Sequence, residues 1–100
     1  MDPASDINHQ DVAAFCDRWG IREFALFGSV LRPDFGPESD VDVLVSFRPD
    51  ADWDYWNWPE MLDQLRGIFG RDVDLVVKES LKNPFRRRRI LDEHRVIHAA

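Results

Sequence analysis

The residues of this chain best suited to chemistry are three aspartates, Asp40, Asp42 and Asp74. Asp40 and Asp42 lie two positions apart in a segment of alternating valines, and side chains two positions apart on a strand share a face. Two carboxylates so close repel each other unless a cation lies between them, and their hard oxygens suit Mg²⁺ or Mn²⁺. If the strand that carries Asp74 pairs beside Asp42, three carboxylates converge. Such a set can hold two divalent ions about 4 Å apart, as in polymerases and nucleases.

The same aspartates also have ordinary structural explanations. Asp40 could be a turn or cap residue after Ser39, and Asp42 could be a solvent-facing strand position. Aspartate is disfavoured inside strands, which weakens this explanation for two on one face. An EF-hand loop also begins Asp-x-Asp, but it needs Gly at the sixth position and Glu at the twelfth. Val45 and Ala51 occupy those positions, so a calcium loop of that type is excluded.

Gly28 and Ser29 offer a second feature with chemical potential, because they follow an apolar segment directly. A glycine lets the backbone approach a phosphate closely, and the amides that open a helix bind anions. The Ser29 hydroxyl would add a donor, and Arg32 could add a charged fork. Taken alone, Gly-Ser is equally what a plain strand-to-helix turn contains. Neither the P-loop pattern nor the dinucleotide glycine pattern is present.

Hydrophobic periodicity predicts the elements that must position these residues. Apolar stripes at helical spacing predict helices over about 8–19, 59–69 and 83–97, with a short helix opening at Ser29. Apolar or alternating segments predict strands over 21–27, 40–47 and 72–77. Segments 33–38 and 48–57 are expected to be loops. This order predicts one α/β (or α+β) domain over residues 1–100, with a small mixed sheet flanked by helices.

Composition and charge limit the class of protein. The chain has 100 residues, 44% hydrophobic and 32% charged, which is typical of one globular domain. It has no long apolar run, no secretory signal pattern and a single cysteine, so a cytoplasmic protein without membrane contact is expected. Its 13 basic residues against 19 acidic ones give a net charge of −6, which disfavours direct binding to nucleic acid.

Two clusters of residue types have more than one interpretation. The four consecutive arginines at 86–89 could form a solvated helix face, or reach nucleotide phosphates or an acidic surface of a partner. Trp53, Trp56 and Trp58 flank an acidic loop. They could cap a small core, stack on adenine or contact a partner, since exposed aromatic residues are favoured at interfaces.

The motifs in combination are more specific than each one alone. The segment 27–32, Phe-Gly-Ser-Val-Leu-Arg, followed by 39–45, Ser-Asp-Val-Asp-Val-Leu-Val, resembles the signature of polymerase-beta-like nucleotidyltransferases. That signature is Gly-Ser, a short spacer and Asp-x-Asp. The segment 70–76 looks like the strand that carries the third carboxylate of this family. Within it, the chain is most similar to the minimal nucleotidyltransferase (MNT) antitoxins that are paired with HEPN toxins.

The resemblance implies a nucleotide site. Gly28 and Ser29 would hold the triphosphate, with Arg32 and Ser39 as further nucleotide-binding residues. Relatives often have Gly after the arginine, whereas Pro33 follows it here, which leaves the phosphate contact of Arg32 open.

The resemblance also implies a metal site. Asp40 and Asp42 would each ligate Mg²⁺, and Asp74 would complete the site and help to activate the attacking hydroxyl. Asp72 is a rival for that role because it shares the face of the strand. Asp74 is preferred because it directly precedes a Leu-Val pair, as the third aspartate of the family does.

The activity implied by the resemblance is Mg²⁺-dependent nucleotidyl transfer, with two Mg²⁺ ions (or Mn²⁺) and ATP as substrate. AMP would pass to a tyrosine hydroxyl of a cognate HEPN-domain RNase toxin, within a hetero-oligomer, and so neutralise the toxin. Only one helix is expected after Asp74, so another molecule is expected to present the acceptor. The alternative is a non-catalytic antitoxin that inhibits the toxin by complex formation alone.

Overall fold

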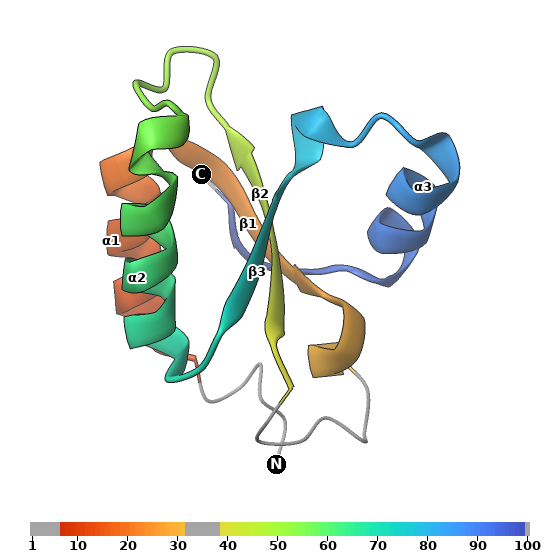
Figure 1. Ribbon diagram of the computed structural model, residues 1–100, viewed down its shortest axis with the longest axis horizontal. Coiled ribbons are helices and arrows are strands. Elements are labelled where there is room, and N and C mark those ends of the chain that lie inside the picture. The colour runs from red at the N-terminus through yellow and green to blue at the C-terminus, as the bar shows by residue number, and fades with distance from the viewer. Residues whose placement is uncertain (1–6, 32–38, 100) are drawn as a thin grey trace.

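A four-stranded mixed sheet organises the computed structural model, which describes residues 7–31 and 39–99 (Figure 1). The elements in chain order are α1 (His9–Trp19), β1 (Ile21–Phe27), the 3₁₀ turn η2 (Gly28–Leu31), β2 (Val41–Phe47), η3 (Tyr55–Asn57), α2 (Trp58–Phe69), β3 (Val73–Val77), η4 (Lys78–Ser80), α3 (Pro84–Glu93) and β4 (Arg95–Ala99). The strand order is β3-β2-β1-β4. β1 is antiparallel to both β2 and β4, whereas β2 and β3 are parallel. The predicted mixed sheet is confirmed; Arg32 and the loop expected at 33–38 lie outside the described residues.

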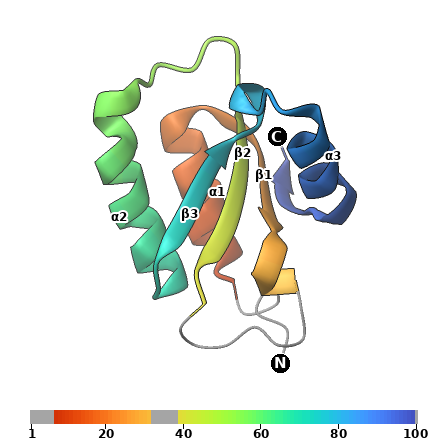
Figure 2. The same cartoon turned by 45° about the vertical axis from the view of Figure 1, so that its right-hand side comes forward.

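The helices cover the two faces of the sheet unequally. α1 and α2 lie together on one face, and α3 lies on the other (Figures 1 and 2). The larger core, between the helix pair and the sheet, includes Val12, Phe24, Val43, Leu65 and Leu75. The smaller core under α3 is built from Ala25, Phe27, Leu44 and Ile90. Because successive residues of β2 alternate between these two faces, Asp42 shares the face of α3.

Local signals fix the ends of the two packed helices. The Asn8 side chain caps α1 by accepting hydrogen bonds from the backbone N–H groups of Gln10 and Asp11, both at 3.1 Å. Gly20 and Gly70, with φ of 69° and 70°, end α1 and α2 in the left-handed conformation. The predicted helices at 8–19 and 59–69 are therefore confirmed to within one residue at each end. No helix among the described residues is long and apolar enough to span a membrane.

The predicted final helix at 83–97 is confirmed as far as Glu93 and is wrong over residues 94–97. α3 ends at Glu93, and Arg95–Ala99 forms β4, which pairs antiparallel with β1. Only Ile90 of the predicted apolar stripe is buried in α3, so the helix has little packing to extend it. The free edge of β1 offers backbone hydrogen bonds instead, and tertiary pairing overrides a weak helical pattern. A helix and a strand, and not one helix alone, therefore follow Asp74.

Candidate active site

The parallel pairing of β2 with β3 aligns two of the candidate carboxylates. Asp42 is the register partner of Asp74, and Val43 is the partner of Leu75. Directly paired residues of adjacent strands point to the same face and lie about 5 Å apart. Asp42 is half-buried and Asp74 is exposed, on the face that α3 partly covers. The pairing on which the convergence of carboxylates depends is thus present.

Asp40 and Ser39 lie just before β2, at the same end of the sheet as Asp42 and Asp74. Asp40 is exposed and Ser39 is half-buried. The guanidinium of Arg71 donates a hydrogen bond to the carbonyl oxygen of Ser39 at 3.3 Å. The backbone N–H of Val41 donates to the carbonyl of Asp72 at 3.0 Å, which ties the start of β2 to the start of β3. The approach to β2 is therefore held against the segment that leads to Asp74.

Gly28 brings the glycine turn against the carboxylate pair. Its φ is +73°, and Phe27 directly before it is the register partner of Asp42. A Cβ atom added at Gly28 would collide with Oδ2 of Asp42 and lie 3.2 Å from its Cγ. Only glycine fits here, because both the left-handed backbone and the close approach exclude a side chain. The backbone of Ser29 continues from this position into η2.

Asp72 and Asp74 differ in their surroundings although they share the strand phase. The Asp72 carboxylate forms an ion pair with Nε of Arg66 at 3.3 Å, and Arg66 belongs to α2 on the opposite face. Asp74 is instead aligned with Asp42. This arrangement favours Asp74 as the third carboxylate of the candidate site.

The donor set suits a metal ion that is shared with a substrate. The described residues contain no group of three or more His, Cys, Asp or Glu side chains placed to hold a metal by themselves. Mg²⁺ in nucleotide-binding sites is commonly held by one or two carboxylates together with substrate phosphates and water, and not by an all-protein cage. Asp42 and Asp74, with Asp40 at the strand entrance, fit that mode of binding.

An open groove of about 350 Å³ begins at Asp74 and follows β3. Tyr55 and Trp58 line it from η3 and α2, and Leu81 and Arg86 line it from the segment after β3. The sequence singled out Trp58 and Arg86, but it gave no signal for Tyr55 or Leu81, whose position depends on how the chain returns past β3.

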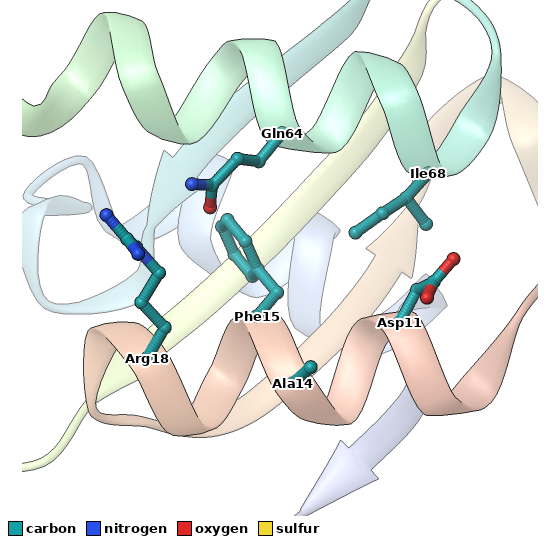
Figure 3. Close-up of a pocket in the computed structure, with 6 residues that line it drawn as sticks. All are labelled: Asp11, Ala14, Phe15, Arg18, Gln64 and Ile68. Atoms are coloured by element: carbon teal, nitrogen blue, oxygen red, sulfur yellow. The ribbon is translucent and has the colours of Figure 1, made fainter.

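A second pocket of about 270 Å³ lies away from these carboxylates, between α1 and α2 (Figure 3). It is lined by Asp11, Ala14, Phe15, Arg18, Gln64 and Ile68. Cys16 of α1 does not line this pocket; it is buried, and burial raises the pKa of its thiol to about 12. The thiol is therefore neutral at pH 7 and is no nucleophile.

Comparison with known proteins gives the class to which this sheet and its carboxylates belong. A family model described as a nucleotidyltransferase domain matches residues 12–97. This chain belongs to the nucleotidyltransferase domain family, as the motifs at 27–32 and 39–45 indicated.

Two named relatives extend the comparison. A protein of Methanocaldococcus jannaschii, provisionally named a protein adenylyltransferase, is 32% identical over 77 residues, which cover 77% of each chain. Protein adenylyltransferase MntA of Thermococcus cleftensis is 39% identical over 67 residues, which cover 67% of this chain and 66% of that protein.

Solved structures share the fold. A chain of a toxin–antitoxin complex with AMP-PNP superimposes with a TM-score of 0.73 at 19% identity, covering 94% of this chain and 75% of that one. A chain from the complex of tri-AMPylated Shewanella oneidensis HEPN toxin with MNT antitoxin gives 0.65 at 20% identity, covering 93% and 71%. At these identities the likeness establishes the fold alone, and it confirms the predicted fold class.

Proposed function

We propose that this chain is a Mg²⁺-dependent protein adenylyltransferase that moves AMP from ATP to a tyrosine hydroxyl of a HEPN-domain RNase toxin and thereby neutralises it. The observation that carries the proposal is the register of Asp42 with Asp74 beside the turn at Gly28. Relatives named protein adenylyltransferases and the fold shared with MNT antitoxins support it.

The reaction assigns a task to each group. The tyrosine oxygen attacks the α-phosphorus of ATP, a new P–O bond forms, and the bond to the bridging oxygen of the β-phosphate breaks, so that pyrophosphate leaves. The exposed carboxylate of Asp74 accepts the hydroxyl proton. Asp40, Asp42 and Asp74 would hold Mg²⁺, which would neutralise charge on the phosphates and lower the pKa of the hydroxyl.

The nucleotide contacts follow from the same end of the sheet. Gly28 carries no side chain, so its backbone lies against the Asp42 carboxylate, and such a backbone is able to approach a phosphate that shares a metal ion with Asp42. Ser29, Arg32 and Ser39 complete the proposed nucleotide contacts. Positioning and electrostatic stabilisation by these groups would supply most of the rate enhancement.

The test uses the HEPN-domain protein that this proposal expects to be encoded beside this chain. The two proteins are incubated with Mg²⁺ and ATP labelled at the α-phosphate, and label on the HEPN protein is followed with its RNase activity. We expect transfer of label and loss of RNase activity. Asp42→Asn should reduce transfer by a factor of about 100 or more, because it removes a charged ligand from the reaction centre.

Asp72→Asn is the matched control, since it removes the same charge from the rival aspartate that is paired with Arg66. It should retain transfer. Inhibition of the toxin without label would instead establish the non-catalytic antitoxin. Equal loss of transfer in both variants would contradict the assignment of the site.

A further inference from the structure

The outer edge of β3 presents backbone groups that no described strand pairs with. In the order β3-β2-β1-β4, β3 has a neighbour on one side only (Figure 2). The carbonyl of Asp72 accepts from β2, and a parallel ladder uses alternate residues, so the even-numbered residues of β3 pair with β2. The groups directed outward are the N–H and C=O of Val73, Leu75 and Val77. Such an edge is a template for another extended chain.

The groove that begins at Asp74 runs along this same edge. Its lining includes four consecutive residues of β3, from Asp74 to Val77, so the strand forms its floor. A ligand that follows the groove therefore passes the outward amides of the strand before it reaches the proposed site of transfer. An extended polypeptide satisfies both the shape of the groove and the hydrogen-bonding groups of its floor.

Three strongly exposed aromatic residues line the groove or are next to its lining residues in the chain. Trp56 is 91% exposed, Phe85 is 84% exposed and Tyr55 is 71% exposed. Tyr55 lines the groove, Trp56 follows it in the chain, and Phe85 precedes the groove residue Arg86. Tyrosine, tryptophan and arginine are the residues enriched in the energetic centres of protein interfaces.

The charges that line the groove also define its ligand. Among the described residues that line it, Asp74 is the only anion and Arg86 is the only cation. Asp74 is taken by the proposed chemistry at one end. Arg86 remains exposed on the wall and complements a carboxylate of the ligand.

We propose that an extended, acidic segment of the acceptor protein docks along β3 as an added strand, which leads its hydroxyl-bearing residue to Asp74. This inference rests on the proposed function and names how the acceptor is recognised. The backbone of Val73, Leu75 and Val77 pairs with the segment, the aromatic residues cover it, and Arg86 binds its acidic side chain.

The first test measures the Kd of the full chain for its proposed HEPN-domain partner and the rate of AMP transfer. Arg86→Glu should raise the Kd and lower the rate by about tenfold or more, because it reverses the charge that faces the segment. Arg88→Glu is the matched control, because it makes the same change on the same helix. Arg88 is exposed and does not line the groove, and its Nε lies 3.8 Å from Oδ2 of Asp92.

The second test addresses the strand edge directly. Val77→Pro removes an outward N–H, which edge strands tolerate, whereas Val77→Ala shortens the same side chain and keeps the N–H. The proline variant should bind the HEPN protein at least tenfold more weakly than the alanine variant. Amide hydrogen exchange on the wild-type complex should show new protection in residues 73–77.

The outcomes separate this inference from the proposed function. If the Arg86→Glu and Val77→Pro variants transferred AMP as fast as the wild type, docking along β3 would be overturned. The proposed transferase activity would still stand. Weaker ATP binding in Arg86→Glu, with unchanged HEPN binding, would make the groove a nucleotide pocket and also overturn it. If the wild type neither labels nor binds the HEPN protein, the proposed function fails and docking fails with it.

Discussion

At the scale of single residues, Gly28 is the position where backbone conformation and site chemistry meet. Gly28→Ala should cost about 1–2 kcal/mol of stability for an alanine in the left-handed region, and its Cβ would displace the carboxylate of Asp42. We therefore expect AMP transfer to fall at least tenfold. Denaturant unfolding and the labelling assay measure the two effects separately.

Gly70 provides the control for this prediction, because it has nearly the same φ of +70° but no atom within 4 Å of an added Cβ. Gly70→Ala should lose a similar amount of stability and keep its transfer activity. If both variants lost activity equally, the effect would come from global destabilisation and not from contact with Asp42.

At the scale of elements, strong local sequence signals were sufficient to predict where a helix or strand begins and ends. The alternating valines predicted β2 to within one residue, and Asn8, Gly20 and Gly70 bounded the helices. The matching phase of Asp42 and Asp74 is likewise a local property, so the sequence could indicate that they share a face. Whether the two residues lie side by side depends on the parallel register of β2 and β3, which the structure shows.

Features that depend on contacts between distant segments could not be predicted in this way. β4 exists because β1 has a free edge, and a weak helical stripe over 83–97 concealed it. The groove at Asp74 depends on where Tyr55 and Leu81 return beside β3, and neither residue carries a local signal. The separation of two residues in the sequence gives no measure of the distance between them in the fold.

One connection between elements can be tested by its hydrogen bonds. Glu79 of η4 accepts from the hydroxyl of buried Ser46 at 2.7 Å and from the N–H of Phe47 at 3.2 Å, which fastens η4 to the end of β2. Glu79→Ala leaves the Ser46 hydroxyl and the Phe47 N–H without that acceptor, so we expect a loss of about 1–2 kcal/mol in urea unfolding.

Glu60→Ala is the comparison for Glu79→Ala. Glu60 pairs with Arg18 at 2.6 Å, but both side chains are about half exposed. Exposed ion pairs contribute little, so this variant should lose less than about 1 kcal/mol. A loss for Glu79→Ala no larger than that for Glu60→Ala would mean that η4 is held by packing alone.

At the scale of the whole molecule, one face of the sheet holds most of the core and the other holds the candidate site. α1 and α2 bury one face and supply most of the core, whereas the carboxylates lie on the other face beside the groove. The proposed substrate is an anion that must approach aligned carboxylates on a chain of net charge −6. A divalent cation resolves this conflict, because it binds both partners and removes their repulsion.

Binding should therefore stabilise the molecule only when metal and nucleotide are present together. With ATP and Mg²⁺ at 100 times the Kd, mass action adds about 2.7 kcal/mol to the free energy of unfolding. For a domain of this size that corresponds to a rise in Tm of roughly 11–22 °C. ATP with a chelator, or Mg²⁺ alone, should leave the Tm nearly unchanged in the same thermal unfolding experiment.

The aspartate variants show whether this stabilisation comes from the aligned pair. Asp42→Asn should abolish the joint shift, since it removes the carboxylate between Gly28 and Asp74. Asp72→Asn should keep the shift, because the carboxylate of Asp72 is paired with Arg66. An equal shift with ATP and a chelator would mean that the nucleotide binds without metal. In that case the carboxylates of β2 and β3 would not oppose nucleotide binding, and the argument that a divalent cation must join them to the substrate would be wrong.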